Sequence, residues 1–309
     1  MKYVLITAAR NEEKFIQGTI RSVVAQTRLP ERWVIVDDGS TDRTAEIVAR
    51  YTKDYRWIEL IRRPQRKDRN FAGKVHAFND GLARVQPIEA ELIGNLDADV
   101  SFWPDHFEFL LKKFVDVPLL GVAGTAYSEE GWDSTRDSFE GQTSVHGACQ
   151  LFRKRCFDEI GGYQPSRSGG IDWIAVTTAR MRGWRTWNYR ERRFHHHRTM
   201  GTAERSRLGA MFDYGKKDYF LGGSAIWELF RAGYRMTRKP VLLGGMALLF
   251  GYCTAALQRI ERPVSPELIR FHRREQMAKL LLILSSVIRL KRIDKFLVAA
   301  EAETKLSLK

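Results

Sequence analysis

The sequence predicts an α/β fold for roughly its first two thirds. Strand-like and helix-like segments alternate along the first hundred residues, and polar clusters follow several of the strand-like ones. Such alternation is typical of a sheet of mainly parallel strands covered by helices. After residue 205 the chain becomes more basic and gains a long uncharged stretch. We therefore expect one α/β domain over residues 1–205 and a helical region over residues 206–309.

The alternating segments can be placed from their periodicity and their terminal residues. The first hundred residues predict strands at 3–7, 33–36 and 58–61, helices at 13–26, 41–51 and 73–85, and a strand that ends at Asp97. The next hundred predict a helix ending at 114, strands at 121–127, 147–152 and 184–189, and helices at 154–160 and 171–181. Ligands of open sheets bind beyond the carboxyl ends of the strands, so the clusters at 8–12, 37–41 and 97–99 should converge on one crevice.

Asp97 and Asp99 stand two residues apart where a strand ends. On an extended backbone this spacing directs both carboxylates to one face. Two such carboxylates repel each other unless a cation lies near them, and oxygen ligands favour Mg²⁺ or Mn²⁺. A divalent metal that bridges a diphosphate fits this pattern. A solvated turn at the end of a strand is the alternative.

A second acidic cluster, Asp37-Asp38-Gly39-Ser40-Thr41, follows another predicted strand. Gly39 permits a tight turn, and Ser40 or Thr41 can cap the next helix. One of the two aspartates then remains to accept a hydrogen bond from a ligand N–H. The chain has neither the G-x-G-x-x-G fingerprint nor a Walker A motif, so we expect no nicotinamide cofactor.

These motifs resemble family 2 glycosyltransferases of the GT-A fold. The resemblance rests on Asn11-Glu12-Glu13 after the opening strand, Val36-Asp37-Asp38-Gly39-Ser40-Thr41-Asp42, and Asp97-Ala98-Asp99, in that order. It implies a Rossmann-like mixed sheet that binds a nucleoside diphosphate-sugar donor. The implied roles place Ala8, Arg10 and Glu12 around the base, Asp37 or Asp38 on the base, Asp97 at the ribose, and Asp99 on the metal.

The resemblance also implies roles for Lys74 and Asp172. Lys74 stands where the family often has a basic residue, and a lysine there offsets the charge of the diphosphate; a solvated lysine on a helix face is the alternative. The catalytic base of inverting members belongs to an acidic pair near the position of Asp172. Here the first member is Ile171, so only Asp172 can take the acceptor proton. One carboxylate within about 3 Å of the hydroxyl is enough for a general base. Capping of the helix is the alternative role.

Three consecutive histidines follow the last predicted strand. On an extended segment His195 and His197 share one face and His196 occupies the other. Several GT-A enzymes close the metal site with a histidine at this point of the chain, and we favour His197 for that role; a surface run is the alternative. The Gln-x-x-Arg-Trp motif of processive relatives is absent. The resemblance therefore implies a transferase that adds a single sugar.

The basic charge is concentrated near the C-terminus. The net charge of the chain is +14, and residues 206–309 contain 19 Lys and Arg against 9 Asp and Glu. No motif for nucleic-acid binding accompanies this charge, so we expect no nucleic-acid partner. Residues 240–257 carry no charge, have basic flanks, and are borderline for crossing about 30 Å of hydrocarbon. We expect them to bind the membrane surface as an interfacial or re-entrant segment. A buried helix in a soluble domain is the alternative.

The expected activity is metal-dependent, inverting and non-processive transfer of a sugar to a hydroxyl acceptor, either a lipid-linked glycan or a polysaccharide precursor. The three cysteines have no disulfide or metal-ligand pattern, which favours a reducing compartment. We expect the cytoplasmic face of a membrane, with the cytoplasm as the alternative. A sugar nucleotidyltransferase is the enzymatic alternative, but it needs a basic, glycine-rich loop in place of residues 8–12. A basic scaffold that binds nucleic acid or acidic lipid is the non-enzymatic alternative.

Overall fold

The chain folds into two compact units, Met1–Arg198 and Thr199–Lys309. The computed structural model describes residues 1–65, 71–129, 132–133, 141–166, 169–198, 207–291, 294 and 297–298. The boundary predicted from the sequence lies a few residues later, at 205.

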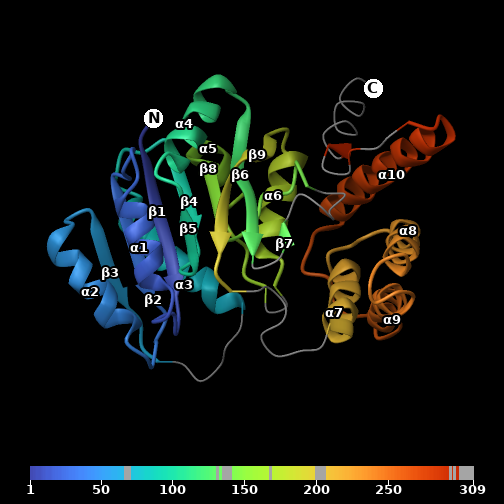
Figure 1. Ribbon diagram of the computed structural model, residues 1–309, viewed down its shortest axis with the longest axis horizontal. Coiled ribbons are helices and arrows are strands. Elements are labelled where there is room, and N and C mark those ends of the chain that lie inside the picture. The colour runs from blue at the N-terminus through green and yellow to red at the C-terminus, as the bar shows by residue number, and fades with distance from the viewer. Residues whose placement is uncertain are drawn as a thin grey trace. The chain divides into compact units, whose positions relative to one another are not determined.

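The first unit is a sheet with helices packed against it (Figure 1). Its strands are β1 (Tyr3–Ala9), β2 (Arg32–Asp37), β3 (Ile58–Arg62), β4 (Leu92–Leu96), β5 (Val100–Phe102), β6 (Leu120–Glu129), β7 (Trp132–Asp133), β8 (Cys149–Arg153) and β9 (Arg185–His196). Its helices are α1 (Ile16–Val24), α2 (Thr44–Asp54), α3 (Phe71–Val85), α4 (His106–Asp116), α5 (Lys154–Glu159) and α6 (Ile171–Met181).

Within the described residues the sheet has nine strands in the order β3-β2-β1-β4-β8-β6-β9-β5, with β7 paired to β6. Strands β3, β2, β1 and β4 are parallel, whereas β8 runs antiparallel to both β4 and β6. The sheet is therefore mixed, as the fold prediction requires. The antiparallel β8 brings the residues before it to the carboxyl end of β4, where the Asp97 N–H donates to the Ala148 carbonyl at 2.9 Å.

The core lies on both faces of this sheet. Tyr3 and Leu5 of β1 belong to one buried apolar cluster, and Val4 and Ile6 belong to a second one. Successive residues of a strand point to opposite faces, so a strand covered on both sides has a continuous apolar sequence. Burial on both faces leaves the strand ends as the place where polar side chains gather.

The helix after β1 begins later than its sequence predicts. The prediction begins at residue 13, whereas α1 begins at Ile16. The backbone N–H groups of Glu12 and Glu13 donate instead to side chains of the segment after β2, to Thr44 at 2.8 Å and to Asp42 at 3.1 Å. Asn11 has a left-handed φ of 56°, which turns the chain toward that segment. Contacts between the two loops thus replace the first helical turn.

The second unit contains four helices among its described residues: α7 (Arg207–Phe220), α8 (Ala225–Met236), α9 (Leu243–Leu257) and α10 (Pro266–Ile288). Glycines bring α7 and α9 together. A Cβ on Gly251 would lie 2.0 Å from the Phe212 carbonyl oxygen, and one on Gly215 would lie 1.9 Å from the Leu248 carbonyl oxygen. Only glycine permits this approach of two backbones. Of the helices in the described part of the chain, none has both the length and the apolar character needed to cross a membrane.

Candidate functional site

The first two polar clusters converge, as the parallel sheet predicts. The Asp38 N–H donates to the Ala9 carbonyl at 2.8 Å. Asn11 accepts from the Thr41 N–H at 2.8 Å, and its own N–H donates to the Ser40 hydroxyl at 3.0 Å. These contacts cross between the ends of β1 and β2, so they fix the two loops against each other. Ala8 and Arg10 are half-buried at the same end of β1.

Both aspartates of the second cluster have protein partners. Asp37 accepts from the Ser40 N–H at 3.0 Å and so closes the turn, in which Gly39 has a left-handed φ of 72°. Asp38 forms an ion pair of 2.6 Å with Arg63, which also lies 2.8 Å from Asp80. No motif in the sequence points to Arg63 as a site residue. Which aspartate binds a base stays a prediction.

Lys74 of α3 reaches the third cluster. Its Nζ lies 2.5 Å from an oxygen of Asp97. Burial lowers the pKa of Lys74, but the charges of Asp97, Asp172 and Asp99 raise it above its usual value. Burial and the neighbouring Asp99 raise the pKa of Asp97, although Lys74 opposes the change. The lysine is thus a charged partner of the acidic cluster rather than a solvated side chain.

Asp99 is the centre of a buried chain of charges. Its Oδ1 lies 3.5 Å from Nε2 of His196, whose Nδ1 lies 3.2 Å from Oε1 of Glu129. Burial raises the pKa of Asp99, but the hydrogen bond and charge of His196, together with Arg198, lower it below its usual value. Burial lowers the pKa of His196, and its contacts with Asp99 and Glu129 raise it further than burial lowers it. Glu129 therefore orients the imidazole toward Asp99.

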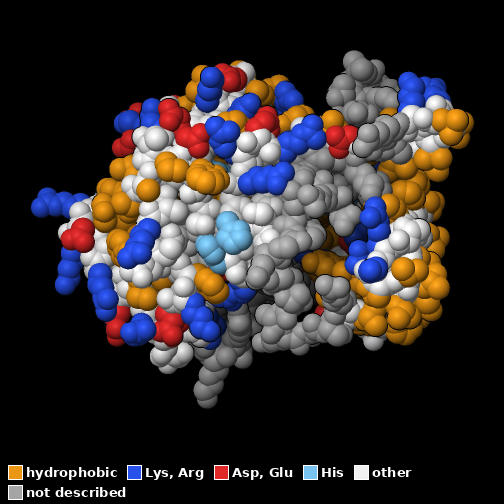
Figure 2. Space-filling model, viewed as in Figure 1, with side chains coloured by type: hydrophobic (Ala, Val, Ile, Leu, Met, Phe, Trp, Pro, Cys, Tyr) orange, Lys and Arg blue, Asp and Glu red, His pale blue; other side chains and the backbone are white. Residues whose placement is uncertain are grey.

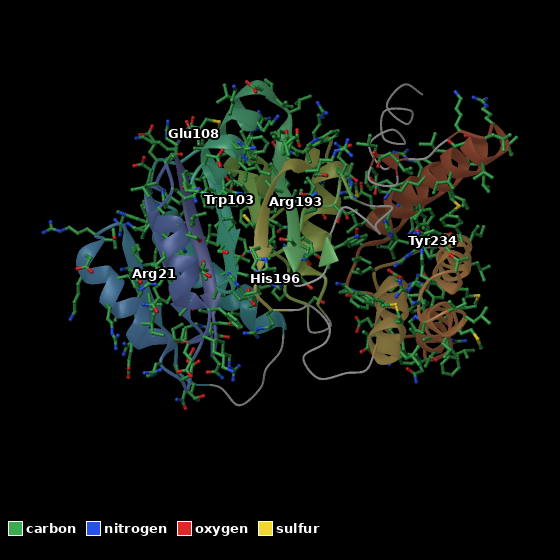
Figure 3. All side chains as sticks on the ribbon, in the orientation of Figure 1. Arg21, Trp103, Glu108, Arg193, His196 and Tyr234 are labelled. Atoms are coloured by element: carbon green, nitrogen blue, oxygen red, sulfur yellow. The ribbon has the colours of Figure 1, made fainter. Side chains whose placement is uncertain are left out.

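The geometry favours His196 over the predicted His197 as a metal ligand. Asp97, Asp99 and His196 each present a ligand atom within 4.8 Å of the others, and the carboxylate oxygens of the two aspartates favour Mn²⁺ or Mg²⁺. His196 of β9 is buried (Figure 3), whereas His195 and His197 are exposed. His197 instead lies 3.0 Å from the Ser101 hydroxyl.

Arg198 joins the first and third clusters. One of its nitrogens lies 2.5 Å from Glu12, and another lies 3.4 Å from Asp99. Glu12 and Arg198 are 186 residues apart in the chain, and no local sequence pattern could have paired them. Arg198, the last residue of the first unit, therefore links the loop after β1 to the acidic cluster.

Asp172 lies in the first turn of α6, whose N-cap is Gly170. It is therefore the second residue of the helix and not the cap. A Cβ on Gly147 would lie 2.6 Å from an Asp172 oxygen, so the absence of a side chain there leaves room for the carboxylate. The Gly147 carbonyl accepts from the Asn95 amide at 2.6 Å. Neither Gly147 nor Asn95 was predicted as a site residue, because only the pairing of β4 with β8 brings them together.

Residues 4–154 match the family described as Glycosyl transferase family 2, so this part of the chain is a glycosyltransferase domain of that family. A poly-beta-1,6-N-acetyl-D-glucosamine synthase of Staphylococcus epidermidis is 29% identical over 120 residues, which are 38% of this chain and 26% of that relative. The chain thus matches about a quarter of the relative's length.

Solved structures show that the fold is GT-A. A mannosyltransferase of Pyrobaculum calidifontis in complex with GDP-Man and Mn²⁺ superposes with a TM-score of 0.55 and 16% identity, over 98% of this chain and 87% of that one. TarS 1-349 of S. aureus in complex with UDP-GlcNAc superposes with a TM-score of 0.54 and 15% identity, over 99% and 92% of the two chains.

Proposed function

We propose that this chain transfers a single sugar from a nucleoside diphosphate-sugar to a hydroxyl group of a glycan or lipid-linked acceptor, with inversion and with a divalent metal. The observation that carries the proposal is the group of Asp97, Asp99 and His196 at the carboxyl ends of the strands. Ligands of such sheets bind at that edge. The family relatives act on sugars, and two structural neighbours hold GDP-Man or UDP-GlcNAc.

The residues of the site have three separate roles in the proposed reaction: metal binding, stabilisation of negative charge, and proton transfer. Asp99 and His196, with Asp97 beside them, would hold Mg²⁺ or Mn²⁺, which would stabilise the negative charge of the departing diphosphate. Lys74 and Arg198 supply fixed positive charges next to the same group. Asp172 accepts the proton of the attacking hydroxyl. Direct attack by the activated hydroxyl on the sugar is a single displacement, which inverts the configuration at the reacting carbon.

The metal assignment is tested with Asp99→Asn. We expect this variant to keep its fold and to lose the stabilisation that a nucleoside diphosphate gives in the presence of Mn²⁺. Ligand at 100 times its dissociation constant stabilises a protein by about 2.7 kcal/mol, which a thermal shift detects. Asp158→Asn, an exposed aspartate on α5, is the control. Metal-dependent binding of UDP or GDP that survives Asp99→Asn would refute the assignment.

The surface of the second unit supports a membrane-bound acceptor. Helix α9 buries small residues such as Gly245, Gly251 and Ala255, and it exposes Met246 and Phe250 by 56% and 68%. On α8, Ile226 and Leu229 are exposed by 60% and 58%. Figure 2 shows hydrophobic side chains gathered on this side of the unit. An exposed apolar surface of this kind marks an interaction site.

Basic residues at the ends of α8 and α9 indicate which partner this apolar face meets. Arg238, Lys239 and Arg259 are exposed at these ends. Each cation near an anionic bilayer adds about 1 kcal/mol of attraction, and apolar side chains between them enter the boundary of the acyl chains. We therefore assign this face to the surface of an anionic membrane, where a lipid-linked acceptor would be presented.

Cosedimentation with vesicles that contain anionic lipid tests this assignment. We expect the full chain to sediment at low salt and to be partly released at high salt. Phe250→Glu should weaken sedimentation, whereas Leu119→Glu, which adds the same charge at a 62% exposed leucine of the first unit, should not. If the full chain stays in the supernatant at low salt, the membrane assignment is refuted, and the assignment of the donor site is unaffected.

A further inference from the structure

A groove on the first unit lies apart from the candidate site. It has a volume of about 490 Å³, within the range of about 300–1,000 Å³ of small-ligand sites. Three segments line it: the residue Thr27 after α1, the connection from β5 to α4, and the middle of β9. None of its residues belongs to the acidic cluster or to the two loops after β1 and β2.

The groove lies along the same pair of strands as the site. In the β5–β9 pairing, Val100 is opposite His196 and Phe102 is opposite Phe194. The next residues along these strands are Trp103 and Arg193, both exposed (Figure 3). At about 3.3 Å per residue, three residues from His196 to Arg193 correspond to about 10 Å. Arg193 is exposed and His196 is buried, so the groove opens at the surface on the other face of β9 from the His196 side chain.

The walls of the groove are held in place by contacts within the protein. Two Arg192 nitrogens lie 2.7 Å and 3.1 Å from one Asp105 oxygen, and the Arg192 guanidinium lies 5.4 Å from the centre of the Phe109 ring. The Thr27 N–H donates to the Pro104 carbonyl at 2.8 Å. These contacts tie β9 and the residue after α1 to the β5–α4 connection. A groove whose walls are fixed before binding loses little entropy when a ligand enters.

The lining combines one aromatic face with charged groups of both signs. Trp103 is 70% exposed, an unusual state for a side chain of its size. The charged residues of the lining are Arg190, Arg192 and Arg193, together with the carboxylates of Asp105 and Glu191. An inorganic anion in the groove would be attracted by the arginines but repelled by these two carboxylates. A sugar has an apolar ring face for the indole and hydroxyl groups that both donate and accept, so it satisfies every part of this lining.

We infer that this groove is a saccharide-binding subsite, which holds a hydroxyl-rich segment of the acceptor glycan. The identity of the bound saccharide as the acceptor rests on the proposed transferase function. The saccharide binding itself does not, because it needs neither donor nor metal.

A printed array of oligosaccharides, with two to six rings and both neutral and uronic-acid-containing members, tests the subsite without donor and with a chelator present. We expect the full chain to bind at least one class of array member, and Trp103→Ala to weaken that binding by about tenfold or more. Trp103→Phe should retain part of it. Leu119→Ala, which removes another exposed apolar side chain, and Asp99→Asn, which changes the acidic cluster, should retain it fully.

Each outcome of the array decides the inference. If the full chain binds no array member, or if Trp103→Ala binds as the full chain does, the subsite is refuted. If binding depends on Trp103 but the chain never uses a nucleotide-sugar, the proposed function fails and the saccharide site stands. If both hold, Trp103→Ala should raise KM for long acceptors and leave the rate of donor hydrolysis unchanged.

Discussion

Replacement of Asp172 by asparagine separates a catalytic base from a residue that only stabilises α6. The change keeps the size of the side chain and removes its charge. A general base contributes about 10²- to 10⁴-fold to a rate, which corresponds to about 3–5 kcal/mol in the activation barrier. We expect Asp172→Asn to lose transfer by that factor.

The effects on stability and on donor binding should be much smaller. Asp172 lies in the first turn of α6, where a negative charge stabilises a helix by about 0.3–1 kcal/mol. It also raises the pKa of Lys74, but Asp97 does so more strongly and remains in place 2.5 Å away. Donor affinity should therefore change only a few-fold, and the free energy of unfolding by no more than about 1 kcal/mol.

The assay compares three quantities in one preparation: transfer to an acceptor, binding of the nucleoside diphosphate, and the thermal midpoint. Glu46→Gln is the matched control, because Glu46 is an exposed acid in the first turn of α2 and lies outside the acidic cluster. Near-normal transfer by Asp172→Asn would show that the carboxylate is not the base. Loss of donor binding together with transfer would show that Asp172 contacts the nucleotide instead.

Three further predictions concern groups that surround the site or hold the second unit together. Glu129→Gln should weaken Mn²⁺ affinity by about 10- to 100-fold, since Glu129 orients His196, and an unchanged Mn²⁺ titration of donor binding would exclude His196 as a ligand. Burial and the Asp218 carboxylate raise the pKa of Glu228 from 4.5 to about 8, so the folded chain keeps a proton that the unfolded chain releases. Stability of the second unit should therefore fall as pH rises from about 4.5 to about 8, and Glu228→Gln should flatten this dependence in thermal melts; equal slopes would contradict it. Gly251→Ala places a Cβ 2.0 Å from the Phe212 carbonyl oxygen and should destabilise the second unit by about 1–3 kcal/mol in urea, leaving donor binding intact; an unchanged midpoint would contradict the α7–α9 packing.

The edge at which the site lies could be predicted from the sequence because parallel strands obey a general rule. Strand-like runs followed by Asn11, Asp37 and Asp97 are enough to bring three polar loops to the same edge of a sheet. The structure places them there through contacts such as Asn11 with Thr41. The order of strands beyond β4 was not predictable in the same way, since β8 and β9 are joined to the sheet by pairings between distant segments.

The choice among the three histidines shows where the sequence argument stops. The alternation of side chains predicts that His196 faces opposite to His195 and His197, but it does not say which face is buried. The predicted strand ends at residue 189, whereas β9 continues to His196 with an irregular register against β6 between Thr125 and Ala126. Such an irregularity changes which residues face inward, and it has no signal in the charges of residues 190–193.

The charges within the site imply that metal and donor bind cooperatively. Lys74 is engaged by Asp97, and Arg198 is engaged by Glu12 and Asp99, so an incoming diphosphate competes with these carboxylates for both cations. A divalent cation that binds these carboxylates would release Lys74 and Arg198, which could then pair with the phosphates. We therefore expect Mn²⁺ to raise the affinity for UDP or GDP, and the nucleotide to raise the affinity for Mn²⁺ by the same factor, because coupling between two ligands is reciprocal. Calorimetric titrations in both orders measure the two factors. If Mn²⁺ and the nucleotide bind independently, the acidic cluster remains paired with Lys74 and Arg198, and the metal lies elsewhere.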